Sequence, residues 1–147
     1  MNERKVTYDT SFYIQILRSR SFAEAFRSRY ETDLPLTFFS SVVVEELLAG
    51  ATDSLRRAAA EGLYRPFERS QRIVTPTHVV WKETGRLLGV IRGQSPGQKD
   101  RLTGSFANDL LIALSAKSIG AKVATLNADD FDLIRKYVPF ALEILKT

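Results

Sequence analysis

Residues 106–131 read FANDLLIALSAKSIGAKVATLNADDF, and this stretch decides the fold class. The spacing of its apolar residues predicts a helix over 106–119 that ends at Gly120. A strand is expected over 122–125, and a second helix over 128–137. Helices and a strand in such close succession are typical of βαβ units, in which helices cover a parallel sheet.

The same alternation runs through the rest of the chain. The sequence therefore predicts one α/β domain over 1–147, with a central, mostly parallel β-sheet flanked by α-helices on both faces. Ligands of such sheets bind at the carboxyl ends of the strands. The other strands are expected at 5–8, 36–40, 72–75 and 140–145. The other helices are expected at 11–30, 42–49, 54–69 (one long or two short) and 77–92, before a loop rich in Gly, Pro and Ser over 93–104.

The composition excludes several kinds of active site. Apolar residues make up 44% of the 147 residues and charged residues 26%, as in soluble globular proteins. Without cysteine, thiolate zinc sites and cysteine nucleophiles are impossible, and the single histidine, His78, excludes multi-histidine metal sites. Trp81 is predicted to lie in the core. The longest uncharged stretch, 34–44, is shorter than the roughly 20 residues of a membrane-spanning helix. With no secretory signal visible either, a soluble, cytoplasmic protein is expected.

The net charge of +4 is unevenly distributed. Basic residues outnumber acidic ones over 1–30 and 56–104, whereas 31–55 contains acidic residues and no basic ones. Basic surface of this kind is typical of proteins that bind a phosphate backbone. Solvated helix faces explain it equally well, so charge alone leaves both interpretations open.

Two acidic residues stand at unusual places in the first third of the chain. Asp9 directly follows the first predicted strand, where it either serves a site or caps the next helix. Glu46 shares a helical face with Val42 and Val43 and is predicted to point inward. Glu45 is turned about 100° away and is the better candidate for a solvent-facing acid. An acid on the rim of the helix remains the alternative for Glu46.

Asp109 lies on the apolar side of its predicted helix, on the face of Ile112, Ala113 and Ala116. Burial of an unpaired carboxylate is costly, so something positive is expected against it. The helix dipole at the first turn supplies only about 0.3–1 kcal/mol. Asp109 therefore indicates a functional site more strongly than the other acids do.

Asp130 opens the helix that follows the strand over 122–125. Asn127 and Asp130 have the spacing of a partial capping box, which is a purely structural explanation for both residues. Asp129 and Asp132 lie close by, so spacing alone does not decide which acid is functional.

These acids are compatible with one metal site. Three of them stand at or just after strand ends, and parallel strands bring their carboxyl ends together. Clustered carboxylates raise one another's pKa unless a cation neutralises them. Oxygen ligands without thiolate or imidazole suit Mg²⁺ or Mn²⁺. On a basic protein, such a site indicates metal-assisted hydrolysis of phosphodiester bonds.

Four motifs in the chain are similar to those of a known family. They are Asp9-Thr10-Ser11, SVVVEELLAG over 41–50, NDLLIA over 108–113 and TLNADDF over 125–131. Their residues and order resemble the PIN-domain ribonucleases, in particular the VapC-type toxins of bacterial and archaeal toxin–antitoxin pairs. Each motif is weak alone, but four in the same order are specific.

The resemblance implies the identity of the site residues. It selects Glu46 over Glu45 and Asp130 over Asp129. The catalytic, metal-binding quartet is then Asp9, Glu46, Asp109 and Asp130. The resemblance adds Ser11, Thr125 and Asn127 as supporting polar residues, with Ser11 standing where many members have Asn.

The resemblance also implies an activity and partners. The activity is RNA cleavage by an endoribonuclease that depends on Mg²⁺ or Mn²⁺. The partners are an antitoxin protein, whose C-terminal segment covers the active-site groove, and a second copy of the chain in a homodimer. Phe12, Tyr13 and Ile16 either serve such a surface or belong to the core. The competing functions are a catalytically silent binding module and a phosphoacceptor domain.

Overall fold

The computed structural model describes residues 4–94, 97 and 103–146. Its central sheet has three parallel strands in the order β1-β4-β5: β1 (Val6–Tyr8), β4 (Lys122–Thr125) and β5 (Leu142–Ile144). A second parallel pair, β2 (Phe39–Ser40) and β3 (Ile73–Val74), is connected to β1 by a parallel bridge between Thr37 and Val6. The predicted α/β class with a parallel sheet is confirmed.

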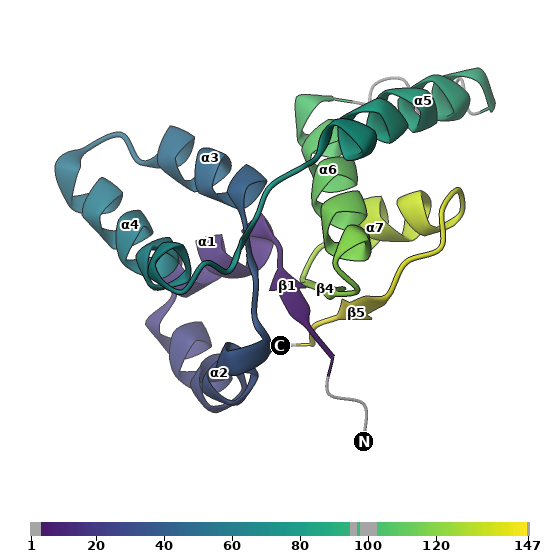
Figure 1. Ribbon diagram of the computed structural model, residues 1–147. Coiled ribbons are helices and arrows are strands. Elements are labelled where there is room, and N and C mark those ends of the chain that lie inside the picture. Colours follow the sequence, from purple (N-terminus) through teal and green to yellow (C-terminus); the bar gives the residue numbers. More distant parts are fainter. Residues whose placement is uncertain (1–3, 95–96, 98–102, 147) are drawn as a thin grey trace.

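Helices surround these strands. Figure 1 shows the strands between two groups of helices, with α1–α4 on one side and α5–α7 on the other. Helices α1 and α6 both contact β4. The helices are α1 (Thr10–Arg18), α2 (Arg20–Asp33), α3 (Ser41–Gly50), α4 (Ser54–Arg69), α5 (His78–Gln94), α6 (Gly104–Ser118) and α7 (Ala128–Arg135), with a 3-10 turn, η1, at Leu34–Leu36.

The helix expected over 11–30 is in fact two helices. Ser19 between them has an extended backbone (φ −131°, ψ 112°), and its hydroxyl accepts a hydrogen bond from the N–H of Phe22 at 3.2 Å. This is the geometry of a serine N-cap, which begins α2 in a new direction. The change of direction brings Phe22 and Phe26 against Phe12, with ring centroids 5.7 and 5.8 Å apart.

The core lies on both sides of the sheet, and all three residues of β1 are buried. The prediction that Trp81 belongs to it is wrong, because Trp81 is 57% exposed. Helix α5 buries Val80, Leu87 and Ile91, and Trp81 is one residue beyond this face. No helix within the described ranges is long and apolar enough to cross a membrane. Most of the loop expected over 93–104 lies outside the described residues.

Candidate active site

Asp9 stands where β1 ends and α1 begins. Its backbone N–H still belongs to the sheet and donates to the carbonyl of Ala124 at 3.1 Å. Its side chain is at the N-cap position of α1 and accepts from the N–H of Phe12 at 3.4 Å. Asp9 is only 2% exposed. The structural interpretation of Asp9 as a cap is therefore correct, yet one long bond to a backbone N–H does not account for a buried carboxylate.

The hydroxyls of Ser11 and Thr125 hold the Asp9 carboxylate. Ser11 Oγ donates to Asp9 Oδ1 at 2.8 Å, and Thr125 Oγ1 donates to Asp9 Oδ2 at 2.7 Å. Both hydroxyls accept backbone N–H groups in turn, Ser11 from Leu126 and Thr125 from Asn127. Burial raises the pKa of Asp9 to about 6, although these hydrogen bonds act in the opposite direction.

Asp109 is the second buried acid, with 7% exposure. It shares its helical face with Ile112 and Ala113, both fully buried. Because α6 begins at Gly104, Asp109 lies in the second turn rather than the first, where the helix dipole contributes less. Burial raises the pKa of Asp109 to about 9, and the charges of the other three acids of the quartet also act in this direction.

Asp130 is in the first turn of α7 and is half-buried, whereas Asp129 is exposed. The capping-box explanation fails, because the Asn127 side chain makes no capping hydrogen bond. Asn127 Nδ2 instead donates to Asp130 Oδ2 at 3.4 Å. A hydrogen bond with Asp130 also contributes to the raised pKa of Asp109, so Asp130 faces the other acids.

Glu46 on α3 is half-buried, and Glu45 is exposed. The Thr10 hydroxyl donates to Glu46 Oε1 at 2.5 Å. Sequence reasoning did not select Thr10, because its partner is 36 residues away along the chain. The only available signal was its place beside Asp9 in the first motif.

The four acids share one electrostatic environment, and the residues fit a divalent cation. Asp9 and Asp109 are buried, and within the part of the chain that the structure describes neither forms an ion pair. In that same part, no three acidic or histidine side chains already stand close enough to hold a metal ion together. Carboxylate oxygens that form no ion pair, with no thiolate or imidazole beside them, are the kind of donor that Mg²⁺ or Mn²⁺ takes.

The parallel α/β fold places Asp9 and Asp130 where helices follow β1 and β4, and it places Glu46 on α3 and Asp109 on α6. The family model described as PIN domain matches residues 6–137. The chain therefore belongs to the PIN-domain family, and the predicted family is confirmed. The domain boundaries 1–147 stay a prediction.

Solved structures support the same fold. The DNA-bound VapBC complex of Salmonella typhimurium contains a similar chain, with a TM-score of 0.67 and 22% identity over 96% of this chain and 98% of that one. A chain of VapBC-1 from nontypeable Haemophilus influenzae has a TM-score of 0.66 and 23% identity, over 95% of this chain and 96% of that one. A chain of FitAcB from Neisseria gonorrhoeae has a TM-score of 0.60 and 20% identity, over 93% of this chain and 95% of that one. No curated protein matches the chain.

Proposed function

We propose that this PIN-domain protein is a metal-dependent endoribonuclease and the toxin of a toxin–antitoxin pair. One observation carries the proposal: Asp9 and Asp109 are buried carboxylates that share an electrostatic environment with Asp130 and Glu46. The ion pairs of the described residues include neither Asp9 nor Asp109. A protein that only binds a partner has no use for such a costly arrangement.

The chain's own residues then have distinct roles. Asp9, Glu46, Asp109 and Asp130 would hold Mg²⁺ or Mn²⁺, and Ser11 and Thr125 orient Asp9 through the hydrogen bonds described above. Asn127 orients Asp130, and Thr10 holds Glu46. When bound, the metal lowers the pKa of a coordinated water and stabilises negative charge on the phosphate.

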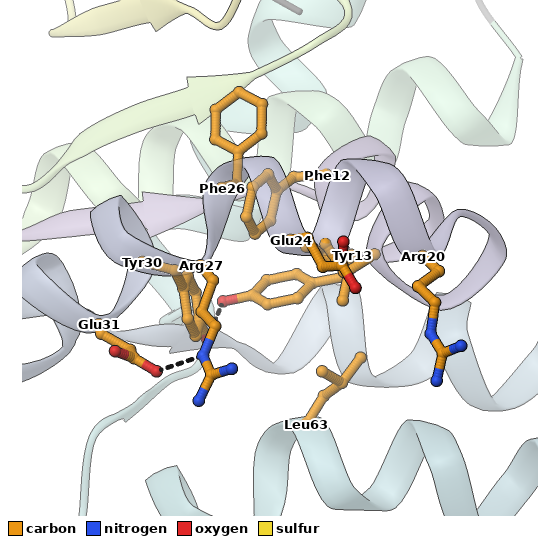
Figure 2. A pocket seen from close by; sticks show the side chains of 11 residues that line it. Phe12, Tyr13, Arg20, Glu24, Phe26, Arg27, Tyr30, Glu31 and Leu63 are labelled. Atoms are coloured by element: carbon orange, nitrogen blue, oxygen red, sulfur yellow. Dashed lines mark hydrogen bonds and ion pairs between the residues drawn. The ribbon is translucent and has the colours of Figure 1, made fainter.

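An antitoxin segment is the proposed occupant of an apolar groove of about 420 Å³ between α1, α2 and α4, whose walls include none of the four acids, so this groove is distinct from the active-site groove that the resemblance implied. Figure 2 shows the groove, with Phe12 and Tyr13 contributed by α1 and Tyr30 by α2. Phe12 and Tyr13 belong to the core, since they are 0% and 1% exposed, and their place beside this groove leaves a role in a contact surface as a prediction. Related structures are VapBC and FitAB complexes, which supports a protein partner.

A homodimer is proposed to form through the exposed side of α5. Val79 is 67% exposed and Trp81 57%, on the two flanks of the buried face of α5, and Trp81 is the larger apolar surface that such a contact would cover. The cytoplasmic location stays a prediction.

The test is cleavage of end-labelled total RNA by the purified chain, freed of any partner. Reactions contain Mg²⁺, Mn²⁺ or EDTA, and a labelled single-stranded DNA is run beside the RNA. Asp109→Asn, with folding verified by circular dichroism, is the inactive variant. Asp129→Asn is its control, because Asp129 is an exposed acid next to the quartet.

Discrete, metal-dependent RNA bands that disappear in Asp109→Asn and persist in Asp129→Asn are expected. Cleavage of DNA but not RNA would support a nuclease and contradict the proposed RNA substrate. Absence of cleavage with every metal would favour the second candidate, a catalytically silent module that binds RNA or a protein.

A further inference from the structure

A second groove, of about 480 Å³, adjoins the acidic site because Glu46 forms part of its wall. Helices α1, α3 and α4 enclose it, and Figure 1 shows these three helices on the same side of the sheet. Its other walls include Ile14, Leu17, Arg18, Arg56 and Ala59. The groove thus combines an apolar surface with two guanidinium groups next to one of the proposed metal ligands.

The two arginines of this groove are poorly neutralised. In the described part of the chain, Arg18 has no ion pair. Arg56 is 3.8 Å from Asp53, and its side chain is 68% exposed. Arg27 and Arg65, by contrast, bind carboxylates one turn away at 3.0 and 2.5 Å. The charges at the groove therefore remain available to an anion from outside the chain.

The apolar wall is also uncovered. Leu17 is 42% exposed although it is a large aliphatic residue, and Ala59 is an exposed residue of the same groove. A single-stranded nucleic acid offers the matching chemistry, because its phosphates bind guanidinium groups and its unstacked bases pack on apolar surfaces. A duplex offers phosphates but keeps its bases stacked.

We propose that this groove binds the single RNA strand beside the phosphate that is cleaved, with Arg18 and Arg56 contacting phosphates and Leu17 packing against a base. The inference rests on the proposed nuclease function and names the path of its substrate. A protein segment is the competing occupant, but Arg18 without an ion pair in the described part of the chain and Arg56 at 3.8 Å from Asp53 suit a phosphate backbone better than an apolar segment.

The test measures RNA binding separately from cleavage. Fluorescence anisotropy of a labelled, mixed-sequence single-stranded RNA is recorded in EDTA between about 50 and 200 mM salt. The RNA is checked for integrity on a gel. The double variant Arg18→Ala/Arg56→Ala is compared with Arg57→Ala/Arg69→Ala, which removes the same charge from exposed positions of α4 that line neither groove.

The Kd of Arg18→Ala/Arg56→Ala is expected to rise about tenfold. Its slope of log K against log salt should fall by about 1.4, or about 0.7 for each phosphate that the variant no longer neutralises. The control double variant should stay within about twofold of the wild type. Leu17→Ala should raise Kd about threefold without changing the salt slope, because it removes apolar surface only. Leu55→Ala, an 81% exposed leucine outside the groove, should have no effect.

Equal effects of the two arginine pairs would overturn the inference, because they would indicate diffuse charge rather than a groove. Unchanged RNA binding by Arg18→Ala/Arg56→Ala would overturn it as well, even if the wild type cleaves RNA. If the wild type binds RNA through Arg18 and Arg56 but cleaves nothing, the groove assignment stands and the nuclease proposal fails. If the double variant misfolds, Arg18→Ala and Arg56→Ala are measured singly, and each should lower the salt slope by about 0.7.

Discussion

The hydroxyl of Thr125 lies between two polar groups of the site. It donates to Asp9 Oδ2 at 2.7 Å and accepts from the backbone N–H of Asn127 at 2.8 Å, and Thr125 is fully buried. Thr125→Val keeps the shape and removes both bonds. We expect the free energy of unfolding to fall by about 1–3 kcal/mol, because the buried Asp9 carboxylate and the partly buried N–H of Asn127 each lose a hydrogen-bond partner. Metal affinity, measured by calorimetric titration, should fall about 10–100-fold.

Thr7 supplies the matched control for this substitution. It is buried in the adjacent strand β1, and its hydroxyl has no hydrogen-bond partner among the described residues. Thr7→Val should leave metal affinity unchanged and stability the same or up to about 1 kcal/mol higher, because no hydrogen bond is removed. Equal losses of metal affinity in the two variants would mean that the hydrogen bond to Asp9 is not the cause.

At the scale of single residues, the sequence selected four acids for one site, which stays a prediction, and it did not predict how each acid is held. Spacing alone did not decide whether Glu45 or Glu46 serves the site, and only the resemblance selected Glu46. The hydrogen bond from Thr10 to Glu46 depends on the packing of α1 against α3, which no local pattern encodes. The burial of Asp109, by contrast, follows from its helical face alone.

At the scale of elements, the carboxylate of Glu143 links β5 to α2 and β4. Glu143 of β5 accepts two hydrogen bonds from Arg29 of α2, at 2.6 and 2.7 Å, and one from Lys122 of β4 at 2.8 Å. The hydrogen bonds from Arg29 lower the pKa of Glu143 to about 2, and the one from Lys122 acts in the same direction. Since the pKa is lower in the folded state, this contribution to stability is present above about pH 4.5 and is lost as the pH falls toward 2.

Glu143→Gln should therefore destabilise the protein at neutral pH, by about 1 kcal/mol after screening by solvent. The difference from the wild type should shrink as the pH is lowered from about 4.5 to 2, as measured by urea unfolding. Glu31→Gln is the control on α2, because the Arg27–Glu31 pair is mostly exposed and should contribute almost nothing. A constant difference across this pH range would contradict the assignment.

The elements themselves were largely predictable. The strand over 122–125 and the helix over 54–69 have the expected bounds, because their apolar spacing is regular. The break at Ser19 was missed, since its neighbours on both sides are compatible with a continuous helix. The strand order β1-β4-β5 was not predictable from local pattern, because β1 and β4 are adjacent only after the long intervening segment has folded.

For the molecule as a whole, the proposed metal site joins distant parts of the chain. Asp9 follows β1, Glu46 lies on α3, Asp109 on α6 and Asp130 on α7, so an ion held by them binds the folded state and not the unfolded chain. Such an ion stabilises the fold by about 2.7 kcal/mol at 100 times its Kd. For a chain of this size, that corresponds to a rise in Tm of roughly 5–10 °C.

We therefore expect Mn²⁺ to raise the Tm of the wild-type protein in differential scanning calorimetry, and EDTA to reverse the rise. Asp109→Asn and Asp130→Asn should each abolish most of the rise, because each removes a charged ligand from the site. Asp129→Asn should keep it, since Asp129 is exposed and lies outside the quartet. An equal rise in all four proteins would place the ion elsewhere on the surface and would remove the physical basis for the proposed metal-dependent cleavage.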